Sequence, residues 1–168
     1  MDELNFTRSV LNWYDSGHRD LPWRRTKDAY SIWVSEIMLQ QTRVEAVKPY
    51  YIRFLQTLPT VKDLANADEE VILKLWEGLG YYSRVRNMQK AAIQIMEDFG
   101  GVFPANQKDL LSLKGIGPYT AGAVGSIAFG LPIPAVDGNV LRVMSRITAD
   151  ASDISLQITK KEWESRLA

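Results

Sequence analysis

The 168-residue chain contains no cysteine and only one histidine, His18. Without cysteine, its residues cannot form a disulfide, a cysteine nucleophile, a thiolate zinc site or a protein-held iron–sulfur cluster. A single histidine also excludes a multi-histidine metal site, and we assign His18 no role. We therefore predict no metal and no cofactor within this chain.

The chain also lacks net charge, because 20 Lys and Arg residues balance 20 Asp and Glu residues. A protein-wide electrostatic attraction to nucleic acid is therefore excluded, and any such attraction must be local. The charges are unevenly placed: basic residues are in excess over residues 17–53 and 81–90, and acidic residues over 59–80. This pattern is compatible with one basic face, although charged runs commonly form solvated surfaces.

No targeting or membrane segment is recognisable. The first ten residues lack the basic start and apolar core of a signal peptide. Residues 115–136 form the longest uncharged stretch, with 22 residues, but five glycines and three prolines divide it. We interpret this stretch as a turn, a short helix and a loop in a soluble core, and we expect no membrane contact.

Helical spacing of apolar residues dominates the sequence. The pattern is clearest at Tyr30, Trp33, Val34, Ile37 and Met38, which form the stripe of a core-facing helix. Hydrophobic residues make up 46% of the chain and charged residues 24%, as in globular proteins. We predict an all-α fold of eight to ten short helices.

Several residues predict helix boundaries. Asn5 can cap a first helix whose apolar side chains, such as Val10 and Trp13, lie on one side. The other predicted boundaries are a capping box from Thr42 to Glu45, a helix end at Gly100 and a helix start near Asp137.

A glycine-rich turn, Gly115-Ile116-Gly117-Pro118, separates two of the predicted helices. Glycine permits a tight turn, and proline is favoured at the first position of the helix that follows. The free amides at the start of that helix attract an anion such as a backbone phosphate. An ordinary helix–helix turn without a ligand is the alternative.

Two carboxylates stand out from their positions. Glu36 lies at the margin of the apolar stripe, where desolvation raises a pKa and favours a general acid, and Leu39 is apolar although it lies opposite the stripe. Asp137 precedes a periodic apolar segment. The alternatives are a solvated boundary glutamate for Glu36 and an ordinary N-cap for Asp137.

Five motifs occur in one order along the chain, and together they resemble a known family. They are Leu21 to Arg24, Ser35 to Thr42, Gly78 to Tyr82, Leu113 to Ala121 and Val136 to Val140. Within the helix-hairpin-helix DNA glycosylase superfamily, the chain is most similar to the MutY-type adenine DNA glycosylases. This resemblance covers most of the chain.

The resemblance implies an all-α helix-hairpin-helix DNA glycosylase fold. We expect residues 30–130 to form a six-helix barrel, with the helix-hairpin-helix at about 107–129. Residues 1–29 and 131–168 would then be parts of a second helical lobe, incomplete at the C-terminus. A groove that both Glu36 and Asp137 face is expected between the lobes.

By the same resemblance, Glu36 protonates adenine at nitrogen 7 and Asp137 stabilises the cationic sugar. Tyr119 and Asn139 would help Asp137 to hold the sugar and the water. Relatives that also cut the strand have a Schiff-base lysine at the position of Tyr119, so the chain is expected to be monofunctional. Taken alone, Tyr119 would be interpreted as a core aromatic.

The resemblance also assigns binding residues, each of which has an ordinary surface or core role as its alternative. The residues expected to line or border the adenine pocket are Arg19, Leu21, Trp23, Arg24 and Leu39. Those expected to enter the duplex are Gln41, Thr42, Leu79 and Tyr81. Those expected to contact DNA at the hairpin are Lys114, Gly115, Gly117 and Tyr119.

The family pattern continues beyond position 168, so we expect an N-terminal catalytic part. Most members have four further cysteines that hold a [4Fe-4S] cluster, and a C-terminal domain that helps to recognise 8-oxoguanine. A cluster is therefore expected only in a longer parent that continues with those cysteines. We expect residues 1–168 alone to bind DNA poorly or to be inactive.

The expected function is base excision repair, by hydrolysis of the N-glycosidic bond of adenine mispaired with 8-oxoguanine or guanine. The expected partner is double-stranded DNA with such a mispair, bound by a monomer in the bacterial cytoplasm at the nucleoid, with a nucleus as the alternative. Two other functions stay open: a thymine or uracil mismatch glycosylase of the same fold, and a non-catalytic helix-hairpin-helix DNA-binding module.

Overall fold

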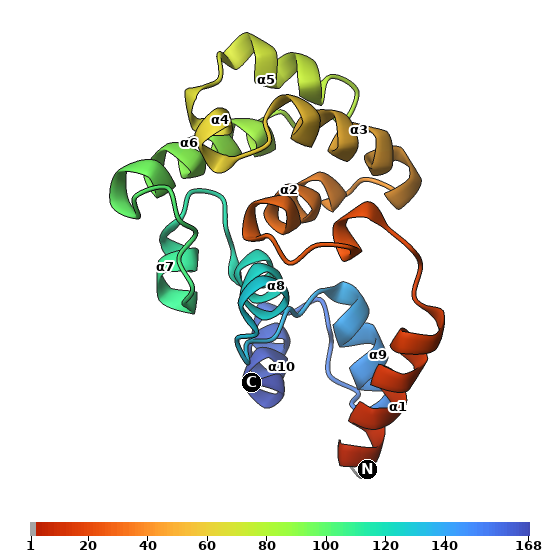
Figure 1. The fold of residues 1–168 in the computed structure, drawn as a ribbon. Coiled ribbons are helices and arrows are strands. Elements are labelled where there is room, and N and C mark those ends of the chain that lie inside the picture. The colour runs from red at the N-terminus through yellow and green to blue at the C-terminus, as the bar shows by residue number, and fades with distance from the viewer. Residues whose placement is uncertain (1–2) are drawn as a thin grey trace.

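The computed structural model describes residues 3–168, and this part of the chain contains helices and no strand, which confirms the predicted all-α class. Figure 1 shows the arrangement, with α2 in the middle and α8 below it. The elements are α1 (Glu3–Gly17), η1 (Pro22–Arg24), α2 (Ala29–Leu39), α3 (Val44–Thr57), α4 (Val61–Asn66), α5 (Glu69–Trp76), α6 (Ser83–Asp98), α7 (Gln107–Ser112), α8 (Pro118–Phe129), α9 (Gly138–Thr148) and α10 (Gln157–Leu167).

Helix α2 is the central element of the fold. It packs against α3 on one side and α8 on the other (Figure 1). The five residues of the predicted apolar stripe are all buried, and so are Ile32 and Ser35 beside them. Asp28 caps the helix by accepting a hydrogen bond from the amide of Ser31 at 2.7 Å. Of the last four residues of α2, Glu36 and Leu39 are only partly buried, so this margin of the helix is open to a ligand.

The core is built around aromatic side chains. Trp33, Phe54 and Trp76 are fully buried, and Phe54 meets Trp76 edge-to-face with ring centroids 6.1 Å apart. A second, small cluster consists of Val136, Leu141 and Trp163 in the C-terminal segment. The large cluster also includes side chains of the loop before α2, namely Leu21 and Trp23.

The predicted division into a six-helix barrel and a second lobe stays a prediction. Between residues 29 and 129 the structure has the seven helices α2 to α8, of which α4 and α7 have six residues each. The helical pair expected at 107–129 corresponds to α7 and α8. Residues 115–136 form a turn, α8 and a loop, and no helix within residues 3–168 is long and apolar enough to cross a membrane.

Two predicted helix starts are wrong. Asn5 lies inside α1, on an exposed face, because the helix already includes Glu3. Thr42 forms no capping box, because α3 begins at Val44 with Arg43 as its N-cap and the Thr42 hydroxyl donates to the Gln40 carbonyl instead. The predicted boundaries at Gly100 and Asp137 are confirmed.

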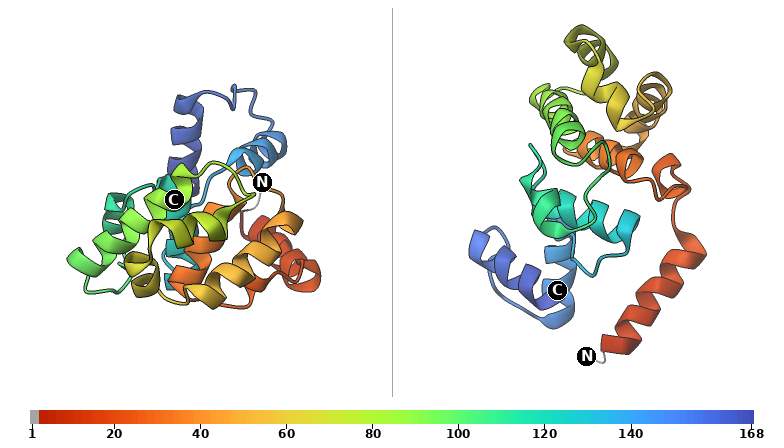
Figure 2. Two further views of the ribbon diagram at one scale, coloured as in Figure 1. Left: turned by 90° about the horizontal axis from the view of Figure 1, so that it is seen from above. Right: turned by 60° about the vertical axis from the view of Figure 1, so that its left-hand side comes forward.

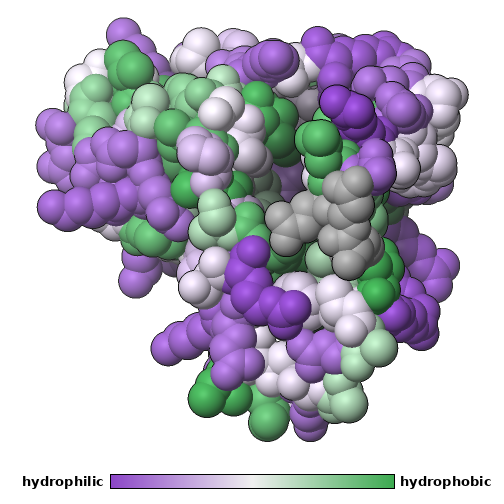
Figure 3. Space-filling view, turned by 90° about the horizontal axis from the view of Figure 1, so that it is seen from below, coloured by the Kyte–Doolittle hydropathy of each residue, from purple (hydrophilic) through white to green (hydrophobic). Residues whose placement is uncertain are grey.

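Helix α1 projects away from α2–α6, as the right-hand view of Figure 2 shows. Its apolar side chains are largely exposed, with Trp13 at 68% and Leu11 at 55%, so the expected one-sided packing of this helix is incomplete. Seen from below, apolar side chains reach the surface in several separate places (Figure 3). Phe6 and Val10 border an apolar hollow of about 400 Å³ between α1 and α9.

Candidate active site

A cavity of about 600 Å³ opens between the loop before α2, the margin of α2 and the start of α8. This volume lies within the range of small-molecule sites. The cavity is lined by both Glu36 and Tyr119. All five residues predicted for the base pocket also line it, namely Arg19, Leu21, Trp23, Arg24 and Leu39. The structure thus brings residues of three separate motifs to one hollow.

Glu36 has the environment of a general acid. Burial raises the pKa of its carboxyl above the ordinary value, a hydrogen bond from Tyr119 partly opposes this rise, and the negative charge of Asp137 adds to it. Burial likewise raises the pKa of the Tyr119 hydroxyl, as do the two carboxylates, so Tyr119 stays protonated and acts as a donor. Glu36 and Asp137 therefore lie within electrostatic range of one another and of Tyr119.

Asp137 is held firmly as the N-cap of α9. Its Oδ1 accepts hydrogen bonds from the backbone amides of Asn139 and Val140, each at 2.9 Å. Its Oδ2 accepts from Nδ2 of Asn139 at 2.9 Å. Arg142 donates to Oδ1 of Asn139 at 3.1 Å and thereby orients that amide. The N-cap interpretation of Asp137 is thus confirmed, and the same carboxylate acts electrostatically on Glu36 and Tyr119. Its role at the sugar stays a prediction.

Two glycines of α8 allow the loop that carries Asp137 to lie close to the helix. A Cβ at Gly122 would overlap the backbone carbonyl of Pro134, and one at Gly125 would overlap the side chain of Ile133. The segment from Leu131 to Ala135 therefore packs closely on α8 at these two glycines. This contact places Asp137 near Tyr119, which lies on the first turn of the same helix.

We expect Gly122→Ala to impair stability and, under the function proposed below, base release. The new methyl group meets backbone, which moves less readily than a flexible side chain, so the loop must shift, at a cost of about 1–3 kcal/mol. A displacement of about 1 Å at Asp137 can lower the rate about 100-fold. Single-turnover base release and thermal unfolding measure both effects. The control is Gly17→Ala, where the added methyl group has no neighbour within 4 Å; equal losses in the two variants would contradict the assignment.

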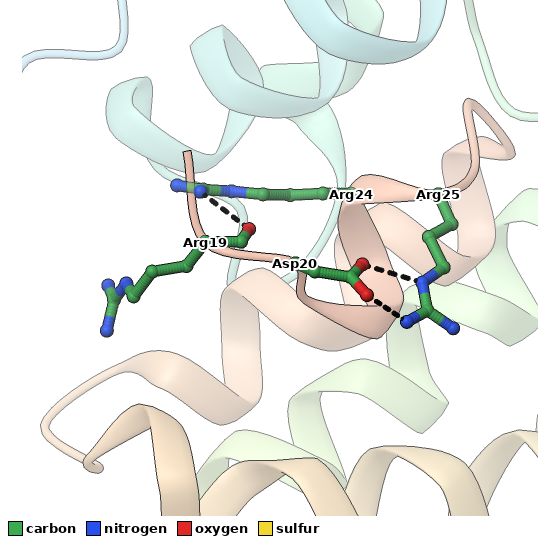
Figure 4. Close-up of polar contacts among 4 residues, drawn as sticks. All are labelled: Arg19, Asp20, Arg24 and Arg25. Atoms are coloured by element: carbon green, nitrogen blue, oxygen red, sulfur yellow. Dashed lines mark hydrogen bonds and ion pairs between the residues drawn. The ribbon is translucent and has the colours of Figure 1, made fainter. Parts of the chain in front are cut away.

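The loop before α2 is fixed by its own charged residues (Figure 4). Asp20 and Arg25 form a two-pronged ion pair, with Nε of Arg25 at 2.8 Å from Oδ1 of Asp20. Arg24 donates to the carbonyl oxygen of Arg19 at 3.1 Å and lies over the ring of Tyr14, 5.3 Å from its centroid. Arg19 itself is exposed at the rim of the cavity, and its side chain points away from this network (Figure 4).

The residues predicted to enter a duplex lie in two turns with unusual backbone geometry. Gln41, with φ of 56°, and Tyr81, with φ of 48°, are both exposed. Thr42 is partly buried. Leu79, by contrast, is 7% exposed and belongs to the core, so in this conformation its side chain is not presented to solvent. Their roles on DNA stay predictions.

The predicted hairpin site is exposed at Lys114, Gly115 and Gly117. Helix α8 begins at Pro118 without a side-chain cap, which leaves its first amides available to a phosphate. Gly115 requires glycine, because its φ is +77° and a Cβ would lie 3.0 Å from that of Asn87. Gly117, with φ of −97°, has an ordinary extended conformation and open space around it.

The donor set does not fit an iron–sulfur cluster, because the chain has no cysteine. Among residues 3–168 no group of three or more His, Asp or Glu side chains is placed to hold a metal ion. His18 stacks on the ring of Tyr14, with centroids 4.5 Å apart, and lies at the exposed end of α1.

Sequence reasoning missed several residues around the cavity. Lys27, Thr26 and Ser35 also line it, and so does Ile127 of α8. Ser35 is the first residue of the motif from Ser35 to Thr42 and could have been found there, and Thr26 lies two residues after the motif that ends at Arg24, whereas Ile127 had no signal. The role of Gly122 was missed too, because a glycine inside a helix does not reveal which backbone approaches it.

Comparison with known proteins identifies the superfamily of this chain. Residues 34–168 match the model of the HhH-GPD superfamily base excision DNA repair proteins. The chain belongs to this superfamily. It is 48% identical over 161 residues to the adenine DNA glycosylase of Rattus norvegicus, which covers 90% of the chain and 31% of the relative. It is 44% identical over 147 residues to the adenine DNA glycosylase of Buchnera aphidicola, covering 87% of the chain and 42% of that relative.

Solved structures of two DNA-acting proteins have the same fold. A thermostable thymine-DNA glycosylase matches with a TM-score of 0.84 and 29% identity, over 95% of this chain and 76% of that one. Endonuclease III in a non-covalent DNA complex matches with a TM-score of 0.74 and 22% identity, over 98% and 82% of the two chains. The chain spans about a third to a half of the length of the curated relatives it matches.

Proposed function

We propose that the protein is a DNA glycosylase that removes adenine mispaired with 8-oxoguanine or guanine. The observation that carries this proposal is the partly buried Glu36 in a 600 Å³ cavity, beside Tyr119 and within electrostatic range of Asp137. The identity of 40–48% to adenine DNA glycosylases over about nine-tenths of the chain supports adenine as the base.

In the proposed reaction the Glu36 carboxylic acid gives its proton to nitrogen 7 of adenine. The bond between the sugar C1′ and the base then breaks, and its electron pair leaves with the base. Asp137 stabilises the positive sugar, as a second carboxylate does in glycoside hydrolysis. Water adds hydroxide to C1′, and its proton restores the acid form of Glu36. Asn139 and Tyr119 hold the sugar and the water.

We further propose that the enzyme is monofunctional. Strand cutting by this chemistry requires an amine that forms a Schiff base with the opened sugar. Tyr119 stands at the position where the resemblance would place that lysine, and its hydroxyl cannot form an imine. Lys27 also lines the cavity, so its amine is the other group whose Schiff base the experiment must exclude. Borohydride treatment during turnover should trap no protein–DNA adduct.

The DNA contacts are proposed to come from the hairpin and the two exposed turns. Lys114 and the first amides of α8 would hold a phosphate, while Gln41, Thr42 and Tyr81 would support the duplex from which the base is extracted. Leu79, whose side chain is buried in this conformation, would reach the duplex only after a change of conformation. The substrate is then chromosomal DNA, reached by a monomer at the bacterial nucleoid, with a nucleus as the alternative. Any [4Fe-4S] cluster would need cysteines from outside these 168 residues.

The deciding experiment measures base release from a set of duplexes with the longest natural form of the protein. The set contains adenine opposite 8-oxoguanine, adenine opposite guanine, and thymine or uracil opposite guanine. Release of adenine alone supports the proposal. Release of thymine or uracil alone would favour the alternative of a thymine or uracil mismatch glycosylase; a thymine-DNA glycosylase has the same fold. Tight binding without any release would identify a DNA-binding module.

We expect Gly117→Val to weaken binding to all duplexes about equally, by about tenfold, because a phosphate contact carries no base information. The backbone at Gly117 has φ of −97° and no neighbour within 4 Å of a Cβ, so the fold should tolerate valine. Affinity is measured for undamaged and mispaired duplexes at one salt concentration, with thermal unfolding as the control. A loss confined to mispaired DNA would contradict the assignment.

A further inference from the structure

One partly buried arginine connects the two turns that carry the exposed residues Gln41 and Tyr81. Arg84 lies in the first turn of α6, and its guanidinium donates to five backbone carbonyl oxygens. Nη1 reaches those of Ile37 at 2.8 Å, Met38 at 3.2 Å and Gln40 at 2.6 Å. Nη2 reaches those of Leu79 at 3.1 Å and Gly80 at 3.2 Å.

The chemistry of the guanidinium suits this position. The last carbonyl groups of a helix have no partner within the helix and form its negative end, so a cation at the end of α2 is stabilising. A planar group with a fork of five donors can serve several carbonyls of two chain segments at once, whereas a lysine offers three donors from a single nitrogen. The guanidinium also lies over the rings of Trp76 and Tyr81, with its central carbon 5.3 and 5.6 Å from their centroids.

Both turns contain a non-glycine residue in the left-handed region, at Gln41 and at Tyr81. Such residues persist only where the surroundings hold them, and they gather at functional sites. Each strained residue directly follows a residue whose carbonyl oxygen accepts a hydrogen bond from Arg84. Gln40 precedes Gln41, and Gly80 precedes Tyr81. The same side chain therefore holds both strained positions next to one another.

The α6 helix also connects this arrangement with the hairpin. Arg84 and Lys114 border the same small hollow of about 70 Å³, and Asn87, one turn further along α6, lies against Gly115. The first half of α6 thus contacts the two turns and the candidate phosphate site.

We propose that Arg84 is a positioning residue for base extraction, which holds the turns at Gln41 and Tyr81 in one fixed arrangement against the duplex. This inference rests on the proposed glycosylase function and adds a residue for which the sequence motifs predicted no role. Flipping a base costs a few kcal/mol, and groups that enter the duplex must be preorganised to offset it. If the fork of Arg84 is lost, the two turns move independently.

The test compares Arg84→Lys with Arg86→Lys, both in a Glu36→Gln background that prevents turnover. Arg86 lies on the same helix, but it is exposed and paired with Glu69 at 2.7 Å. The probe is a duplex with 2-aminopurine in place of adenine opposite 8-oxoguanine, whose fluorescence rises when the base unstacks. The longest natural form of the protein is used at saturating concentration. Circular dichroism and affinity for undamaged duplex are measured in parallel.

We expect Arg84→Lys to lower the equilibrium constant for base flipping by about 10–100-fold. This is the change expected if the variant no longer offsets part of the few kcal/mol that flipping costs. Affinity for undamaged duplex should stay within about threefold, because the hairpin contacts remain. Arg86→Lys should match the parent in both measurements. Flipping by Arg84→Lys at the parent level would overturn the inference, as would an equal loss of flipping and of undamaged-duplex affinity, which marks a general structural role.

The failure of the two proposals can be told apart. If the parent with Glu36→Gln flips no base, the proposed function is overturned and the inference with it. If the parent flips the base and only the Arg84 comparison fails, the inference alone is overturned. Should Arg84→Lys lose its helical signal, Gly80→Ala provides the second variant, because the Gly80 carbonyl is bound by Arg84 and a φ of +70° disfavours alanine although its methyl group has no neighbour within 4 Å. Displacing this carbonyl should lower flipping by at least about threefold with undamaged-duplex affinity retained, and unchanged flipping overturns the inference.

Discussion

Glu36→Gln is expected to abolish most of the base release while leaving affinity for mispaired DNA nearly unchanged. Glutamine keeps the volume and the polar end of the side chain, but it cannot deliver a proton to the base. General acid catalysis contributes about 10²–10⁴ in rate, which corresponds to about 3–5 kcal/mol of barrier. Single-turnover adenine release, measured beside equilibrium binding of the same duplex, separates the two effects.

The pH dependence gives a second test of Glu36. The acid form is the active form, so activity should fall as pH rises through its pKa, which burial and Asp137 hold above the ordinary value of a glutamate. The descending limb of the pH–activity profile should therefore lie above pH 4.5, the ordinary pKa of a glutamate. Glu36→Gln should have no such limb, and a parent profile that is flat up to the titration of other groups would contradict acid catalysis by Glu36.

Glu36→Gln should affect stability in the opposite sense to activity. Because the pKa of Glu36 is higher in the folded than in the unfolded state, the folded protein binds more protons between the two pKa values. Stability is therefore lost as pH rises through this window, and Glu36→Gln removes the loss. We expect the variant to unfold at a higher temperature than the parent at neutral pH, with no difference below pH 4. For catalysis, adenine release by Glu36→Gln within a few-fold of the parent rate would show that Glu36 is only a boundary residue.

Asp137→Asn is the second change with a large expected effect. A neutral amide cannot balance a positive sugar, and the loss of one preorganised electrostatic group typically costs about 10²–10³ in rate. Stability should change by less than about 1 kcal/mol, since asparagine caps helices about as well as aspartate. The Asn139 amide, which now donates to Oδ2 of Asp137, must turn over to accept from the new amide.

The control for this variant is Asp68→Asn. Asp68 is also an N-cap, of α5, but its side chain makes no capping hydrogen bond, and it is exposed. Single-turnover release and thermal unfolding are compared in the two variants. If Asp137→Asn lost several kcal/mol of stability and its rate loss disappeared at low temperature, Asp137 would be a structural cap and its proposed catalytic role would be wrong.

Much of this protein could be predicted from local patterns. The helical class followed from the spacing of apolar residues, because a period near 3.6 has one physical cause, a buried helix face. The α7–α8 turn and the cap at Asp137 were found from residues whose local chemistry restricts the backbone, namely glycine, proline and aspartate. The capping box at Thr42 failed because the same residues that cap a helix also form turns, and only tertiary contacts decide between them.

The sequence by itself determined which carboxylate we propose as the acid, Glu36, which residue caps α9, Asp137, and that a tyrosine stands at 119, together with the absence of thiol chemistry. The tertiary structure decided that these groups meet. Burial between α2 and α8 raises the pKa of Glu36, and the missing side chain of Gly122 lets the Asp137 loop approach. The links made by Arg84 were decided in the same way, because its five carbonyl partners come from segments up to 47 residues away along the chain. Hydrogen bonds to backbone carbonyls leave no pattern in side-chain identity, so such a link becomes visible only in three dimensions.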